Sequence, residues 1–284
     1  MEYYGIISAA VVLFGVTFLF NDRYQKESGS GIGATFVFSL INSIAGLLCL
    51  LIIHSFKLEF TAFTLIMAML TSINNIVYIF CSLKAFEHIN LSLYSIFAML
   101  GGMVLPFVVG IVFYNEPLTL GNGIALLLIM MALAFTIKPG RKKKGAIYYA
   151  GVFMLNGMSG VISKIFQSAP YEKTSAASYS IWTALVGAII AAVVLICIRK
   201  KVKKPNIKAV AYSAGFGAVN KVANYLLLIA LAVLPASVQY PFVTGGTMIV
   251  STVISLICRQ KPSWQELVSV GLSFIGVLVL VFLA

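Results

Sequence analysis

Charged residues are scarce in this chain, and acidic residues are the scarcest of them. Only 10% of the 284 residues are charged, with 20 Lys plus Arg against 8 Asp plus Glu, whereas 61% are hydrophobic. Soluble domains carry about 25% charged residues and about 45 to 50% apolar ones. The composition therefore excludes a water-soluble protein with a single buried core, and it predicts a membrane protein.

Cysteine is also sparse, and its spacing excludes two further classes of site. Cys49, Cys81, Cys197 and Cys258 lie far apart and form no CxxC motif or Cys/His cluster. We therefore expect free thiols, no metal site and no cofactor. The net charge of +12 is compatible with nucleic-acid binding, but the basic residues fall in short loops rather than on a folded aqueous surface. We exclude a nucleic-acid partner on this ground.

Ten apolar stretches are long enough to cross a bilayer, which takes about 20 residues of helix. We predict spans at residues 4–20, 33–53, 62–83, 91–113, 119–137, 146–168, 175–198, 208–232, 235–258 and 265–283. Their continuous apolar runs lack the alternation of a β-barrel strand, and lipid offers no partner for unpaired backbone groups. The predicted fold class is an all-α polytopic membrane protein with ten transmembrane helices.

Basic residues between these spans are concentrated on one side of the predicted bundle. The other side, which includes both termini, holds only Lys57 and Lys173. The positive-inside rule makes the basic side cytoplasmic and places both termini outside. We therefore predict a multi-pass plasma-membrane protein whose termini are extracytoplasmic, with the lipid bilayer as the partner of its basic loops.

The sequence repeats itself. Shifting it by 145 residues matches small, polar and proline residues without a gap: Asn75 with Asn220, Ala85 with Ala230, Ser92 with Ser237, Gly101 with Gly246 and Pro117 with Pro262. Residues 1–140 and 141–284 are thus predicted to be two five-helix copies. Because five is odd, the second copy enters the membrane in the opposite orientation, an arrangement typical of alternating-access transporters.

Motifs at the two ends of the fourth span carry a family resemblance. Residues 85–92 read AFEHINLS and residues 115–119 read NEPLT, while residues 230–237 of the second copy read ALAVLPAS. With these motifs the chain resembles the EamA-like family of the drug/metabolite transporter superfamily, whose halves read "AL..L.AS" and "GEPLT". Here Asn115 replaces the Gly, and the second copy lacks the Glu. The resemblance implies ten helices in two halves and transport of a small metabolite.

Polar side chains at mid-span are the candidates for a substrate site, because such groups are costly in lipid without partners. They are Lys221, Asn220, Asn224, Asn75, Asn74, Tyr78 and Asn156. Lys221 lies about 20 Å from the cytoplasmic end of its span, which is beyond easy snorkelling, and no Asp or Glu is predicted at mid-span. We hypothesise that it contacts an anionic or carboxylate-bearing substrate, the alternative being a packing lysine that donates to backbone carbonyls or Asn side chains. Lys164, near the end of its span, is expected to snorkel to the interface.

Helix breakers occur in the corresponding spans of the two halves. They are Gly101, Gly102 and Pro106 in the fourth span, and Pro241, Gly245 and Gly246 in the ninth. Proline kinks a helix and glycine permits bending, so these positions are candidate gating kinks. Close packing is an equally good interpretation.

The predicted function is therefore transport of a small metabolite by alternating access. Two alternatives stay open: an exporter of drugs or cationic compounds from the same superfamily, and a non-transporting membrane scaffold or receptor. An intramembrane enzyme is a distant second class, since no constellation of nucleophile, base and orienting residue shares one depth. Without a mid-span carboxylate, exchange or facilitated diffusion is favoured over carboxylate-driven proton antiport.

Overall fold

The computed structural model describes residues 2–114, 119–136, 145–199, 202, 204–231, 234, 236–259 and 262–283. These residues form helices and contain no strand, which confirms the all-α class. The helices are α1 (Glu2–Ser28), α2 (Ile32–Ile53), α3 (Ala62–Ala85), α4 (Leu91–Tyr114), α5 (Leu120–Thr136), α6 (Ala146–Ser168), α7 (Ala176–Ile198), α8 (Ile207–Leu231), α9 (Ala236–Ile257) and α10 (Trp264–Leu283). The NEPL segment at 115–118 and the basic residues at 141–144 lie outside the described part of the chain.

Six helices are long and apolar enough to cross a membrane by length and composition, within the described residues. They are α1 over Gly5–Ser28, α2, α3, α4 over Leu93–Tyr114, α6 and α7. The apolar part of α9, Phe242–Ile257, is shorter. The described residues form ten helices at the places of the ten predicted spans, and six of these helices are long and apolar enough to cross a membrane.

The first helix is longer than its predicted span of 4–20, because it continues to Ser28. Its polar end is held by packing and by an ion pair. Asn21 and Asp22 are almost completely buried, and Lys26 Nζ lies 2.7 Å from Asp22 Oδ2, four residues away. Pairs at this spacing support a helix. Hydropathy marks only the apolar part of such a helix, which explains the difference.

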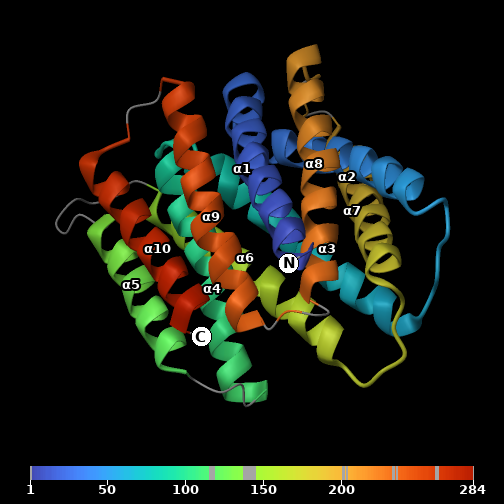
Figure 1. Ribbon diagram of the computed structural model, residues 1–284. Coiled ribbons are helices and arrows are strands. Elements are labelled where there is room, and N and C mark those ends of the chain that lie inside the picture. Colours follow the sequence, from blue (N-terminus) through green and yellow to red (C-terminus); the bar gives the residue numbers. More distant parts are fainter. Residues whose placement is uncertain are drawn as a thin grey trace.

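Eight helices surround the centre, and α5 and α10 pack together at one edge of the bundle (Figure 1). In the first half, α1 packs on α8 and α9, and α2 packs on α7 and α8. In the second half, α6 packs on α3 and α4, and α7 packs on α2 and α3. The central helices thus contact mainly helices of the other half, which leaves the middle of the bundle lined by both.

Two aromatic clusters lie in different helix triads of the bundle. One joins α1, α2 and α8, and the other joins α3, α6 and α7. Ring centroids are 4.6 Å apart for Tyr24 and Phe38, 4.9 Å for Phe38 and Phe216, 6.1 Å for Phe63 and Phe166, and 4.1 Å for Phe166 and Tyr179. Such buried pairs add to the apolar packing.

Candidate functional site: a polar cavity at the centre of the bundle

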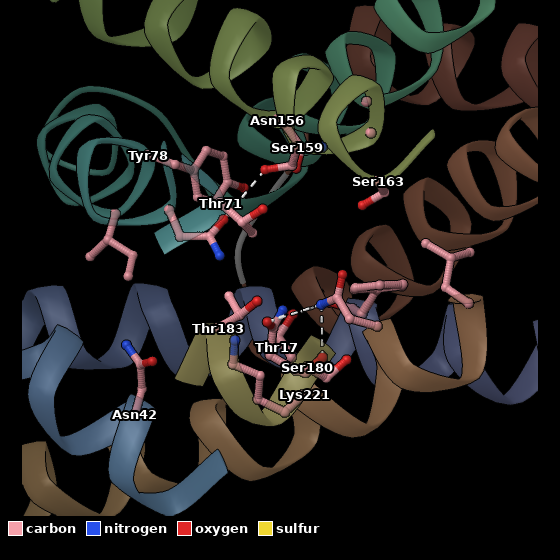
Figure 2. A pocket seen from close by; sticks show the side chains of 18 of the residues that line it. Thr17, Asn42, Thr71, Tyr78, Asn156, Ser159, Ser163, Ser180, Thr183 and Lys221 are labelled. Carbon is pink, nitrogen blue, oxygen red and sulfur yellow. Dashed lines mark hydrogen bonds between the residues drawn. The ribbon is translucent and has the colours of Figure 1, made fainter. Parts of the chain in front are cut away.

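A cavity of about 180 Å³ lies where the eight central helices meet. Its lining residues come from α1 to α4 and from α6 to α9, and none of the described ones comes from α5 or α10. Figure 2 shows that Lys221 and Asn42 enter it from α8 and α2, facing a group from α3 and α6 that includes Thr71, Tyr78 and Asn156. Most of the predicted site residues meet here.

Lys221 lines this cavity from the middle of α8. Its aliphatic stem packs on Gly46 of α2, where an added Cβ would overlap the Lys221 Cγ atom. Among the described residues, no hydrogen bond or ion pair to the ammonium is found, and no Asp or Glu lines the cavity. The described lining therefore supplies no counter-charge for Lys221 when it is protonated.

The α2–α8 crossing that places Lys221 depends on two glycines. An added Cβ on Gly217 of α8 would overlap the backbone of Asn42, and one on Gly46 would lie 2.9 Å from the Gly217 carbonyl oxygen. Small residues at a crossing allow helix backbones to approach closely. The crossing thus brings a turn of α2 against the turn of α8 that precedes Lys221.

The asparagines of the two halves both line the cavity, as expected from their matched positions. Asn224 donates from Nδ2 to the Asn220 carbonyl oxygen at 2.8 Å and to its Oδ1 at 3.1 Å. On the opposite wall, Asn75 Oδ1 accepts a hydrogen bond from Ser159 Oγ at 3.3 Å. Asn75 and Asn220 are therefore both at the cavity surface with polar atoms held by neighbours.

Two further candidates, Tyr78 and Asn156, line the cavity and are anchored to α4. Asn156 Nδ2 donates to the Ala98 carbonyl oxygen at 2.6 Å. The hydroxyl of Tyr78 lies 2.7 Å from that of Tyr94, which lies 2.6 Å from Ser82 Oγ. These bonds fix the position of both side chains at the wall.

Asn74 and Lys164 lie elsewhere than the sequence predicted. Asn74 is absent from the lining, because its Nδ2 donates to the Leu155 carbonyl oxygen at 2.9 Å and to Ser159 Oγ at 2.8 Å, joining α3 to α6. Lys164 does not snorkel to an open surface in this structure. It is 5% exposed, and its Nζ lies 5.1 Å from the centroid of the Tyr114 ring. Cation–π attraction favours this placement.

The candidate kink residues take part in close helix packing. An added Cβ on Gly101 would overlap the backbone of Phe153, and one on Gly102 would lie 2.6 Å from Asn156 Nδ2. Pro106 lies inside α4 against Gly160 of α6. In α9, Gly245 is buried and a Cβ on Gly246 would lie 2.9 Å from Val11 Cγ1, whereas the side chain of Pro241 lies outside the described part. These contacts support the packing interpretation, and gating stays a prediction.

The predicted substrate-binding set contained no residue of α2 or α7. The structure adds polar lining residues from these helices: Ser39, Asn42, Ser43, Tyr179, Ser180 and Thr183. Asn42 and Ser43 at mid-span were the available sequence signal for α2. In α7, serine and threonine recur within an otherwise apolar helix, and their hydroxyls bond mostly to backbone carbonyls of their own helix, as for Ser180 and Thr183. Nothing local distinguishes them as lining residues.

An all-α bundle of apolar helices around a central cavity with polar lining residues is compatible with a membrane transporter. Residues 143–282, a little under half of the chain, match the model of the EamA-like transporter family. This part of the chain is therefore similar to a family of membrane transporters. A crystal structure described only as that of a protein is similar in fold, with a TM-score of 0.67 at 15% sequence identity over 100% of this chain and 98% of that chain. No curated protein sequence matches the chain.

Proposed function

We propose that this protein carries a small anionic, carboxylate-bearing metabolite across the plasma membrane by alternating access. The single observation that carries the proposal is Lys221 in the central cavity, with no acidic residue among the described lining. A cation held away from water is costly unless it meets a partner of opposite charge. A substrate carboxylate bound beside Lys221 supplies that partner, and Asn220, Asn224 and Asn75 provide polar groups around it.

The proposal includes two inverted five-helix repeats, residues 1–140 and 141–284. The contacts between helices support it. When α1 to α5 are replaced by α6 to α10, and the reverse, the main pairs of helices are still in contact. The contact of α1 with α8 corresponds to that of α6 with α3, and α2 with α8 corresponds to α7 with α3. The pairs α2 with α7, α4 with α9 and α5 with α10 correspond to themselves. This pattern is expected of two related halves that meet at a pseudo-twofold axis.

Alternating access requires that each end of the cavity can close in turn. The two aromatic clusters lie in triads that correspond under the same exchange, since α1, α2 and α8 correspond to α6, α7 and α3. One cluster includes side chains near the α1–α2 turn, and the other includes side chains near the α6–α7 turn. If every helix spans the bilayer, these turns are on opposite sides. The clusters are therefore our candidate closures, with Gly101, Gly102, Pro106, Pro241, Gly245 and Gly246 as the flexing points.

The orientation that we propose places both termini outside the cell and the basic loops in the cytoplasm. The charge asymmetry of the loops supports it. In this orientation the α2–α3 and α6–α7 connections are extracellular, while the α1–α2 and α7–α8 connections face the cytoplasm. The partners are then the small-molecule substrate and the bilayer lipids.

The cavity also separates this proposal from its rivals. Aromatic rings line the cavity, but the only ionisable Lys, Arg, Asp, Glu or His side chain among the described lining residues is Lys221, and a protonated Lys221 would repel a cationic substrate. A scaffold or receptor does not move a substrate across the membrane. Transport measured with purified protein therefore distinguishes all three.

The test is uptake of labelled carboxylates into liposomes that contain the purified protein. We expect saturable flux for the wild type and a loss of at least about tenfold in Lys221→Gln, because a charge-assisted hydrogen bond is removed. Lys164→Gln removes the other intramembrane lysine, which does not line the cavity, and should leave the substrate preference unchanged. Equal flux in Lys221→Gln and wild type would refute the site, and no flux above empty liposomes would refute transport.

A further inference from the structure

Helix α2 carries two polar groups that are buried beside the cavity without a hydrogen-bond partner. Asn42 is 6% exposed and Ser39 is 1% exposed. In the described part of the chain, neither the Asn42 Nδ2 atom nor the Ser39 Oγ atom has a hydrogen-bond partner. Both residues line the cavity. Because buried polar groups in proteins are nearly always satisfied, each such exception requires an explanation.

The two residues lie on one face of α2, since they are three positions apart. The α2–α8 crossing places the Asn42 backbone against Gly217 and places Gly46 against Lys221. Side chains of a helix lean toward its N-terminus. The Lys221 side chain therefore leans from its own turn toward the Gly217 turn, where Asn42 lies. Figure 2 shows Asn42 and Lys221 on separate helices, each extending toward the cavity.

The other half of the cavity lacks this pair. The alignment of the two halves at 145 residues places Gly187 opposite Asn42 in the repeat, and Ile76 opposite Lys221. Both of these residues also line the cavity. A polar pair that served only the packing of this helix crossing would be expected in both copies. Its presence in one half alone fits an asymmetric ligand.

We propose that Ser39 and Asn42 form a subsite of the substrate site, which binds a neutral polar group carried next to the anionic group that meets Lys221. This proposal rests on the proposed function and narrows its substrate to anions that also carry a hydroxyl or carbonyl oxygen. That oxygen accepts from the Asn42 amide, and Ser39 completes the contact. A site built to hydrogen-bond such a group rejects the analogue that lacks it, because its own buried groups then stay unpaired.

The test compares carboxylates that differ by one hydroxyl: lactate with propionate, and malate with succinate, as competitors and labelled substrates in proteoliposomes. We expect the wild type to prefer the hydroxylated member by about tenfold or more. Asn42→Leu and Ser39→Ala should reduce the preference for the hydroxylated member to a ratio of about one. Both variants should still take up the simple carboxylate. Thr35→Val is the matched control, because it removes a buried hydroxyl of α2 outside the cavity, and it should keep the wild-type ratio.

Thermal unfolding without substrate provides a second, independent result. An amide retained for a ligand is unsatisfied in the empty protein, so Asn42→Leu should raise the unfolding midpoint by about 2 °C or more. A lowered midpoint together with a wild-type hydroxyl preference would overturn the subsite and leave the proposed function standing. If the wild type takes up neither member of either pair, the proposal of an anionic substrate is refuted, and the proposed subsite is refuted with it.

Discussion

Gly46 of α2 packs directly on the aliphatic stem of Lys221 of α8, and no side chain larger than hydrogen fits between the two. The stem of the lysine thus lies against α2, and the residue also lines the cavity. Lys221 itself marks the candidate site in the sequence, but the glycine that positions it is visible only in the structure. The first prediction follows from this pair.

Gly46→Ala should displace Lys221 and open the α2–α8 crossing. We expect a loss of about 1–3 kcal/mol in the free energy of unfolding, which is typical of overpacking, and reduced uptake. Gly271→Ala is the matched control because nothing lies within 4 Å of an added Cβ in α10. It should leave both stability and uptake near the wild-type values. Thermal unfolding in detergent and liposome flux measure the two effects, and a neutral Gly46→Ala would contradict the packing.

Adjacent glycines of α4 should differ in their tolerance of a methyl group. The Gly101 position faces the backbone of Phe153, which cannot move without shifting α6, whereas Gly102 faces the side chain of Asn156. Gly101→Ala should therefore lower the unfolding midpoint more than Gly102→Ala. Gly102→Ala should mainly alter substrate affinity, because Asn156 lines the cavity. The reverse order of midpoints would show that α4 and α6 are not packed in this way.

The α2–α3 connection is held to α7 by Glu59. Glu59 Oε2 accepts from the Ser175 backbone N–H at 2.6 Å, and the Glu59 carbonyl oxygen accepts from Trp182 Nε1 at 2.8 Å. The Ser175 backbone N–H, with its side chain, lowers the pKa of the Glu59 carboxyl. The contact is therefore complete at neutral pH and is lost only as the pH falls through this lowered pKa.

Hydrogen exchange of the 54–61 and 174–178 segments tests the Glu59 contact. Protection should be constant from about pH 8 to about pH 5 and should fall below that range. Glu59→Ala should exchange faster at every pH, whereas Glu172→Ala, which removes an exposed carboxylate of the neighbouring connection, should match the wild type. Loss of protection well above pH 5 would contradict the sign of the shift.

Orientation is tested by labelling single cysteines in intact cells. The four native cysteines are free and are first replaced. Lys57→Cys in the α2–α3 connection should react with a membrane-impermeant maleimide added outside, and Lys204→Cys before α8 should react only after permeabilisation. The opposite pattern would place both termini in the cytoplasm.

Residue type and spacing were sufficient to predict the all-helical class and several of the polar residues that line the cavity. Asn75, Tyr78, Asn156, Asn220, Asn224 and Lys221 all reach the cavity because polar groups at mid-depth have few other places to go. Helix ends were harder, as α1 shows, because buried polar residues such as Asn21 and Asp22 extend a helix beyond its apolar part.

The misplacements have one physical cause, namely that the direction a side chain faces depends on the neighbouring helix. Asn74 and Asn75 are adjacent, equally polar and both bonded to α6, yet only Asn75 lines the cavity. Lys164 is held over Tyr114, on a different helix. Ser39 and Asn42 are distinguished from other polar residues of α2 by the lack of a hydrogen-bond partner for Ser39 Oγ and Asn42 Nδ2 in the described part of the chain, which the sequence does not show. Sequence periodicity predicts which residues share one face of a helix. It does not predict whether that face contacts another helix or lines the cavity.

The central claim is that Lys221 selects an anionic substrate, and the most direct measurement is charge selectivity in liposomes. Uptake of one carboxylate is compared with uptake of its uncharged amide, for wild type, Lys221→Arg and Lys221→Gln. The account predicts that wild type and Lys221→Arg prefer the carboxylate, and that Lys221→Gln loses this preference. An unchanged preference in Lys221→Gln, or a wild type that prefers the amide, would contradict it.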